Sequence, residues 1–437
     1  MKYKAVSLLF IFTIAAGADL KSQSIFGLPE IFQQANQNRK VSADYDMDFR
    51  YDFDWRNFNA CDDILSKSMV INSVRLTPSV GLSLQQDRNT RHRVLFGISV
   101  MKELGANPAS AVLFQDENDE KLKNLALFQK ILVYYDFKRS NGKANFEALA
   151  GVFPNSYRSG YYSRSVFSDI DRIYNPEIEG AMLKYETTRF KYELGLDCTS
   201  SKAIERVLGY NLFTSGEYSP FRWGSIGWNG NFAIVRPSIL TDANADNLLL
   251  NPYLKFELGY KLGMEELSLR AGALASYQID RFGENKPRFP MGAEIILSAR
   301  NWGFGIEDSF FYGDNMMPFQ SIKYSYEYSS SSFTSLIYKG ESIYCTQRGY
   351  ASINNRLELF YAPAFSDFVD LKASAIGYVI NGNDAIKPFV GWQAKLSLYL
   401  KLDSFRNQGK SIYGQGGKKN ARRKSGASQS GRSTFNL

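Results

Sequence analysis

The chain has 437 residues, 15% of them aromatic, and a formal net charge of +8. This length would accommodate two or three ordinary domains, but no composition break and no Pro-, Gly- or Ser-rich linker divides residues 41–402. The positive excess lies outside that span, because the residues after Asp403 include eight Lys or Arg and no Asp or Glu. The net charge therefore does not indicate a basic, nucleic-acid-binding fold.

Residues 1–18 have the layout of a secretory signal peptide. Two lysines precede the apolar run Ala5–Ala16, and small residues follow at the expected cleavage positions. The run is shorter than the roughly 20 residues of a spanning helix, so we expect removal rather than anchoring. Residues 19–40 are then expected to form an N-terminal periplasmic segment. No nucleic-acid partner is expected for an exported chain.

The first predicted strand begins in the stretch "DYDMDFRYDFDW", residues 44–55. Apolar or aromatic residues occupy every odd position, and Asp or Arg occupies every even position. Successive side chains of a strand point to opposite faces, so this strand has one apolar face and one charged face. The four aspartates of the predicted strand 45–59 (Asp46, Asp48, Asp52 and Asp54) lie on one face, which would be very costly in a dry core but not against water.

The same two-residue period recurs along the chain and predicts about sixteen strands. Examples are "HRVLFGISV" at 92–100, "LKFELGYKL" at 254–262 and "VGWQAKLSLYLKL" at 390–402. The expected strands are 45–59, 69–84, 91–103, 125–138, 143–153, 178–187, 189–198, 206–217, 225–235, 253–262, 267–279, 291–300, 302–312, 350–361, 369–380 and 388–402. Connections after even-numbered strands are mostly short, whereas the long ones (104–124, 154–177, 236–252 and 313–349) all follow odd-numbered strands.

These features resemble those of the porin-like outer-membrane β-barrels of Gram-negative bacteria, over residues 41–402. The resemblance implies an all-β fold: a transmembrane, antiparallel, up-and-down barrel with short periplasmic turns and long outer loops. It differs in one respect, because such barrels usually finish with their last strand, whereas about 35 residues follow here. On the strand pattern, the expected pore-lining residues are Asp46, Asp48, Arg50, Asp52, Asp54, Lys255, Glu257, Lys261, Arg270, Glu294, Arg300, Arg356, Glu358, Lys372 and Lys395.

No enzyme chemistry, metal site or cofactor is indicated. His92 is the only histidine, which rules out multi-histidine metal sites, and its expected position is an interfacial one near a periplasmic strand start. Mixed charge on a wet wall explains the carboxylate pairs without an acid–base role. Cys61, Cys198 and Cys345 match no metal-site spacing, and the sequence does not choose among their three pairings.

Two functions follow as hypotheses. The first is a monomeric or trimeric channel for passive passage of small solutes, in contact with membrane lipid and with outer loops narrowing its mouth. The second is a non-conducting barrel that serves surface adhesion or export and assembly machinery. Residues 403–437 are expected to be a disordered basic tail, either simply solvated or in contact with an anionic or protein partner in the periplasm.

Overall fold

A computed structural model describes residues 40–58, 68–105, 127–198, 208–236, 244–281, 285–316, 338–341, 344, 352–365, 368–381 and 388–403. The expected signal peptide and the basic tail lie outside these residues, as do Cys61, Cys345 and nearly all of segment 19–40. Cys198 has a free thiol. Among the described residues, every helix is too short or too polar to cross a membrane.

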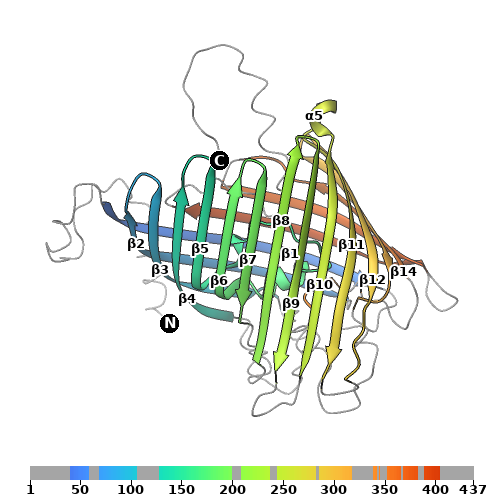
Figure 1. The fold of residues 1–437 in the computed structure, drawn as a ribbon. Helices are drawn as coiled ribbons and strands as arrows, with labels where there is room; N and C mark the ends of the chain where they lie inside the picture. The colour runs from blue at the N-terminus through green and yellow to red at the C-terminus, as the bar shows by residue number, and fades with distance from the viewer. Residues whose placement is uncertain are drawn as a thin grey trace. The chain divides into compact units, whose positions relative to one another are not determined.

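Sixteen antiparallel strands form a closed barrel in which each strand pairs with its sequence neighbours and β1 pairs with β16 (Figure 1). The strands are β1 (Lys40–Phe58), β2 (Met69–Gln85), β3 (Thr90–Glu103), β4 (Leu127–Ser140), β5 (Ala144–Pro154), β6 (Glu177–Thr187), β7 (Phe190–Asp197), β8 (Leu208–Phe221), β9 (Gly224–Arg236), β10 (Ala245–Glu257), β11 (Glu266–Asp280), β12 (Met291–Asn301), β13 (Phe304–Gly313), β14 (Ser352–Tyr361), β15 (Val369–Ile380) and β16 (Phe389–Asp403). The predicted fold class and strand number are confirmed.

Closure follows from the two-residue period of the first and last strands. Outward residues pair with outward residues, as Phe49 does with Leu400, and inward charges of opposite sign face each other, as Asp54 and Lys395 do. A register slip of one residue would turn both sets to the wrong face, so the pattern fixes the pairing. The closed barrel leaves no strand edge unpaired, which a lipid environment requires.

Most connections keep the predicted alternation, but the expected long loop 236–252 is wrong: β10 begins at Ala245, so the connection is residues 237–244, no longer than residues 258–265 after β10. Residues 86–89, 141–143, 188–189, 222–223 and 302–303 form short turns after even-numbered strands. In the last of these, Trp302 (φ 52°) and Gly303 (φ 78°) both have positive φ, as a two-residue type I′ hairpin requires. We call this the turn end of the barrel and the opposite rim the loop end. Short turns face the periplasm in bacterial outer-membrane barrels.

One predicted strand was misplaced. The predicted strand 253–262 is wrong at both ends: β10 begins earlier, at Ala245, and ends at Glu257. The chain then forms a single helical turn, α5 (Gly259–Leu262), which ends at Gly263 in the left-handed conformation. The alternating sequence continued past the strand end, and α5 lies beyond the barrel rim between β10 and β11 (Figure 1).

The exposure pattern is the reverse of that in a water-soluble protein. In β1, Tyr45 and Trp55 are 46% and 47% exposed, whereas Asp46 and Asp54 are 2% and 1% exposed. The same inversion holds around the barrel, with exposed Phe96, Ile131 and Leu254 on the outer surface. The outer surface is therefore an apolar belt suited to acyl chains, and most charged side chains of the strands face inward.

Candidate functional site: the lumen and its inner loop

The connection between β5 and β6, residues 155–176, folds into the barrel; we call it the inner loop. It contains a 3-10 turn (Asn155–Tyr157) and helix α4 (Asp169–Tyr174), which Ser168 caps by accepting the backbone N–H of Asp171. The sequence predicted only a long outer loop at this place. The apolar residues of this segment could have distinguished an inner loop from an outer one. Among them, Val166, Phe167 and Ile173 are all buried in the structure.

The acidic face of β1 holds the start of the inner loop. Tyr157 donates its hydroxyl to the Asp46 carboxylate at 2.6 Å, and Ser156 donates to Asp48 at 2.7 Å. Across the lumen, Glu193 of β7 accepts the backbone N–H groups of Ser159 and Gly160 at 2.7 and 3.0 Å. Wall carboxylates therefore position the loop by accepting hydrogen bonds that its backbone and hydroxyl groups would otherwise lack.

Arg164 fixes the middle of the inner loop to the opposite wall. Its guanidinium forms ion pairs with Glu307 of β13, with Glu358 of β14 at 3.2 Å and with Glu341 at 3.7 Å. Burial lowers the pKa of Arg164, but the carboxylates of Glu307 and Glu358 outweigh this effect and raise it well above its usual value. The guanidinium therefore remains charged at every accessible pH.

The wall completes this ionic cluster. Arg356 forms an ion pair with Glu358 at 2.9 Å, and Lys372 of β15 reaches the same carboxylate at 2.6 Å. Three cations (Arg164, Arg356 and Lys372) thus meet three carboxylates (Glu307, Glu341 and Glu358). We call these six residues the Arg164 cluster. Because the charges balance, the inner loop can be held here without an uncompensated buried charge.

Helix α4 is held by a separate ion pair, between Asp169 and Lys395 of β16. Burial raises the pKa of the Asp169 carboxyl, but Lys395 and Arg164 together lower it well below its usual value. Near the end of the helix, the Ile173 carbonyl accepts from Arg75 of β2, and Tyr174 donates to Glu103 of β3. The inner loop therefore contacts wall residues on both sides of the barrel.

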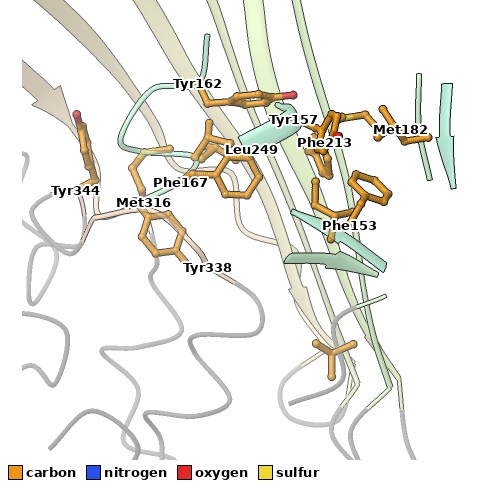
Figure 2. Packing of buried hydrophobic residues seen from close by; sticks show 14 of the residues in the cluster. Phe153, Tyr157, Tyr162, Phe167, Met182, Phe213, Leu249, Met316, Tyr338 and Tyr344 are labelled. Atoms are coloured by element: carbon orange, nitrogen blue, oxygen red, sulfur yellow. The ribbon is translucent and has the colours of Figure 1, made fainter. Parts of the chain in front are cut away.

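An apolar cluster fills part of the lumen on the loop-end side of the inner loop. Phe167 of the loop packs edge-to-face against Phe213 of β8 and Tyr162, with ring centroids 5.9 and 5.1 Å apart (Figure 2). Met316, Tyr338 and Tyr344, from the connection after β13, join the same cluster. These inward apolar residues depart from a simple rule of polar inner faces, and the sequence analysis did not anticipate them.

A polar cavity of about 280 Å³ lies on the turn-end side of the inner loop. Its wall residues come from the turn-end halves of the strands, and residues 159–162, Arg164, Asp169 and Arg172 of the inner loop line it from the other side. The lining includes eight Lys or Arg and eight Asp or Glu side chains. The cavity is therefore strongly polar but close to charge-balanced.

The predicted pore-lining residues divide into three groups. Lys255, Arg270, Glu358, Lys372 and Lys395 line the cavity. Inward-facing residues that hold the inner loop or the wall network, rather than bordering the cavity, are Asp46, Asp48, Arg50, Asp52, Asp54, Glu257, Glu294, Arg300 and Arg356. The prediction that Lys261 lines the pore is wrong. Lys261 is exposed on α5 beyond the end of β10, because the strand stops four residues earlier.

Arg270 has the most unusual setting within the cavity. Its guanidinium lies 3.4 Å from the ring centroid of Tyr161 and 5.1 Å from that of Tyr253. The Tyr253 ring extends over Gly227, where a β-carbon would come within 2.4 Å of it, and its hydroxyl donates to Glu217 at 3.1 Å. Two tyrosine faces therefore orient this cation, and the glycine makes room for one of them.

His92 lies on the outer face near the start of β3, as predicted. Its ring nitrogens lie 2.6 Å from the Tyr135 hydroxyl and 2.9 Å from the Gln86 side-chain oxygen. It has no carboxylate or serine partner in these contacts. Within the described parts of the chain, His, Cys, Asp and Glu side chains form no cluster of three or more suited to a metal ion.

The closed barrel, its apolar belt, its polar lumen and its alternating turns and loops now fix the type of molecule. The chain forms a porin-like transmembrane β-barrel. Barrels of this kind, with an even number of antiparallel strands in one chain, are outer-membrane proteins of Gram-negative bacteria. The predicted location in the outer membrane is confirmed.

No family model and no curated protein matches the sequence of this porin-like barrel. Solved structures with a similar fold include OpdL of Pseudomonas aeruginosa, with 10% identity, 83% of this chain and 99% of that chain covered, and a TM-score of 0.45. OmpTdeltaL8, a loop-deletion mutant of an outer membrane protein of Vibrio cholerae, has 8% identity, 83% and 99% coverage, and a TM-score of 0.44. Salmonella typhi OmpF, in a complex with daunomycin, has 8% identity, 84% and 99% coverage, and a TM-score of 0.42. Likeness at this level establishes no function.

Proposed function

We propose that this porin-like barrel is a channel for the passive passage of small polar solutes across the outer membrane. The observation that carries the proposal is the polar cavity on the turn-end side of the inner loop, with its eight cationic and eight anionic side chains. Hydrated, charge-lined space inside a sixteen-stranded barrel is the arrangement that passes solutes rather than one that stores a hydrophobic ligand. In this proposal the inner loop sets the size limit.

The lining also favours a class of solute. Because the two signs of charge are balanced, the cavity should not discriminate strongly between small anions and small cations. The residues assigned to solute contact are Lys255, Arg270, Glu358, Lys372 and Lys395, which border the cavity. Asp46 and Asp48 are assigned instead to positioning the inner loop, since both accept hydrogen bonds from it.

Reconstitution tests the proposal directly. Purified, refolded barrel in planar bilayers should give discrete conductance steps, and proteoliposomes should swell in small polar solutes but not in large oligosaccharides. Heat-unfolded protein in the same lipid is the control. Folded protein that gives neither conductance nor swelling would refute the channel.

The apolar cluster favours a second candidate, a non-conducting barrel that serves adhesion or export and assembly machinery. Phe167, Phe213 and Tyr338 pack inside the barrel rather than against lipid, so part of the lumen is filled (Figure 2). Under this alternative the Phe213→Ala variant would still not conduct. Under the channel proposal, wild type conducts and Phe213→Ala conducts more, because the cluster partly obstructs the same path.

A further inference from the structure

A carboxylate lies on the lipid-facing surface, midway along a strand. Asp308 is in the middle of β13 (Phe304–Gly313), in register with Leu297 of β12 and Leu357 of β14. Ile306 and Tyr312, which share its face of the strand, are 39% and 52% exposed. Glu307 and Ser309 point the other way, toward the lumen, so the alternation leaves Asp308 facing outward.

Asp308 has one polar neighbour on that surface, Asn355 of β14. The Asn355 side-chain amide donates to the Asp308 carboxylate at 2.7 Å. Asn355 also faces outward, since Ile353 and Leu357 on either side of it in the alternation are both 41% exposed. A carboxylate has several acceptor positions and the amide has a second N–H, so each group retains unused hydrogen-bonding capacity.

Acyl chains cannot satisfy that capacity. Polar and ionisable groups within the hydrocarbon are costly, and where they persist they mark a functional contact with a partner group. The pair lies among apolar neighbours (Ile306, Phe310, Leu297 and Leu357), so no other wall residue in register with it supplies a hydrogen bond. A partner molecule that excludes lipid from this face would remove the cost.

Two strands near the pair, β11 and β15, also carry small residues on their outer face. The outward positions on β11 include Ala271, Ala273 and Ala275, and those on β15 include Ala373 and Ala375. Small residues permit close approach of two membrane proteins. Strands β11 to β14 follow one another in the barrel wall, and β11, β12 and β14 are labelled along the same side of the barrel in Figure 1. The outward face of β11–β15 therefore combines a polar pair with small residues on its two outermost strands.

We propose that this face binds a second copy of the chain around a two-fold axis normal to the membrane. The patch carries both a donor and an acceptor, so in a two-fold contact Asn355 of each copy can donate its second N–H to Asp308 of the other. Such an arrangement, in which residue i contacts j and j contacts i, is what a two-fold interface requires. The same patch presented to an unrelated partner would need a matching pair on that partner.

Cysteine cross-linking in native membranes tests the proposal. In a background with all three native cysteines replaced by serine, Leu357→Cys should give an oxidation-dependent dimer. Leu183→Cys is the matched control, because Leu183 is an equally exposed mid-strand leucine (43% against 41%) on β6, in the other half of the barrel. Equal cross-linking of the two variants, or a Leu357→Cys adduct with another protein, would overturn the proposal.

A second measurement separates a contact role from a folding role. The Asp308→Leu/Asn355→Leu double variant should keep the heat-modifiable gel mobility of a folded barrel while losing the dimer in mild detergent. Asp308→Asn, which keeps hydrogen-bonding groups on the face, should retain more dimer than the double variant. A double variant that remains dimeric contradicts the inference, and this outcome is independent of whether the barrel conducts.

Discussion

Arg164 of the inner loop and Glu358 of β14 form an ion pair at 3.2 Å across the lumen. The two residues are 194 positions apart in the chain. Arg164 belongs to the loop between β5 and β6, and neither of these strands is next to β14 in the barrel. Through this pair a loop that leaves the barrel wall after β5 is attached to the strands on the far side. The position of the inner loop, and hence the free cross-section of the lumen, depends on such contacts.

Arg164→Ala should loosen the inner loop. It removes the loop's cation from the Arg164 cluster and leaves Glu307, Glu341 and Glu358 with only two partners. Because the Arg164 side chain is 20% exposed, the loss of stability should be smaller than the roughly 3–5 kcal/mol typical of breaking a fully buried pair. Single-channel recordings should show larger, noisier openings. Arg189→Ala, in an exposed turn, is the control and should leave conductance unchanged.

Charge reversal at the cavity should set ion selectivity. Lys191 and Glu186 both border the cavity and form an ion pair at 3.2 Å. Lys191→Glu should shift the reversal potential in a salt gradient toward cation selectivity, and Glu186→Lys should shift it toward anion selectivity. Both shifts should shrink between about 0.1 M and about 1 M salt, as the Debye length falls from about 10 Å to about 3 Å. Shifts of the same sign in both variants would argue against these positions lining the conducting path.

Phe167→Ala should destabilise the apolar cluster. The Phe167 side chain is 3% exposed and packs against Phe213, so truncation leaves a cavity at a cost of about 3–5 kcal/mol. Urea unfolding in lipid vesicles measures the effect. Phe221→Ala removes an equally large ring that is 58% exposed on the outer surface, and it should cost much less. Equal losses for both variants would show that the cluster does not contribute to folding stability.

Acid should weaken the attachment of α4. The pKa of Asp169 lies well below its usual value in the folded chain, chiefly because Lys395 outweighs the effect of burial. A carboxyl with a depressed folded pKa adds stability that is fully present above its unfolded pKa, about 3.9, and is lost as pH falls through the folded value. Protease accessibility of the inner loop should therefore rise only below about pH 4. Asp169→Asn should show raised accessibility already at pH 7, with no further rise from this group in acid.

The sequence alone determined the barrel. The strict alternation in β1 and β16, the sixteen runs of period two and the parity of turns and loops are local properties, and bilayer physics converts them into a closed wall with known inward and outward faces. For this reason fourteen of the fifteen predicted wall residues face inward, and only Lys261 was misplaced, where the alternation ran past the strand end into α5.

Only the tertiary structure decided what occupies the lumen. The path of residues 155–176 depends on partners as distant in sequence as Asp46, Glu307 and Lys395, and no periodicity in the loop encodes those contacts. The same holds for Asp308 and Asn355, whose pairing depends on the β13–β14 register across a connection of 38 residues. Local alternation fixes which way a side chain points, whereas long-range pairing fixes what it meets.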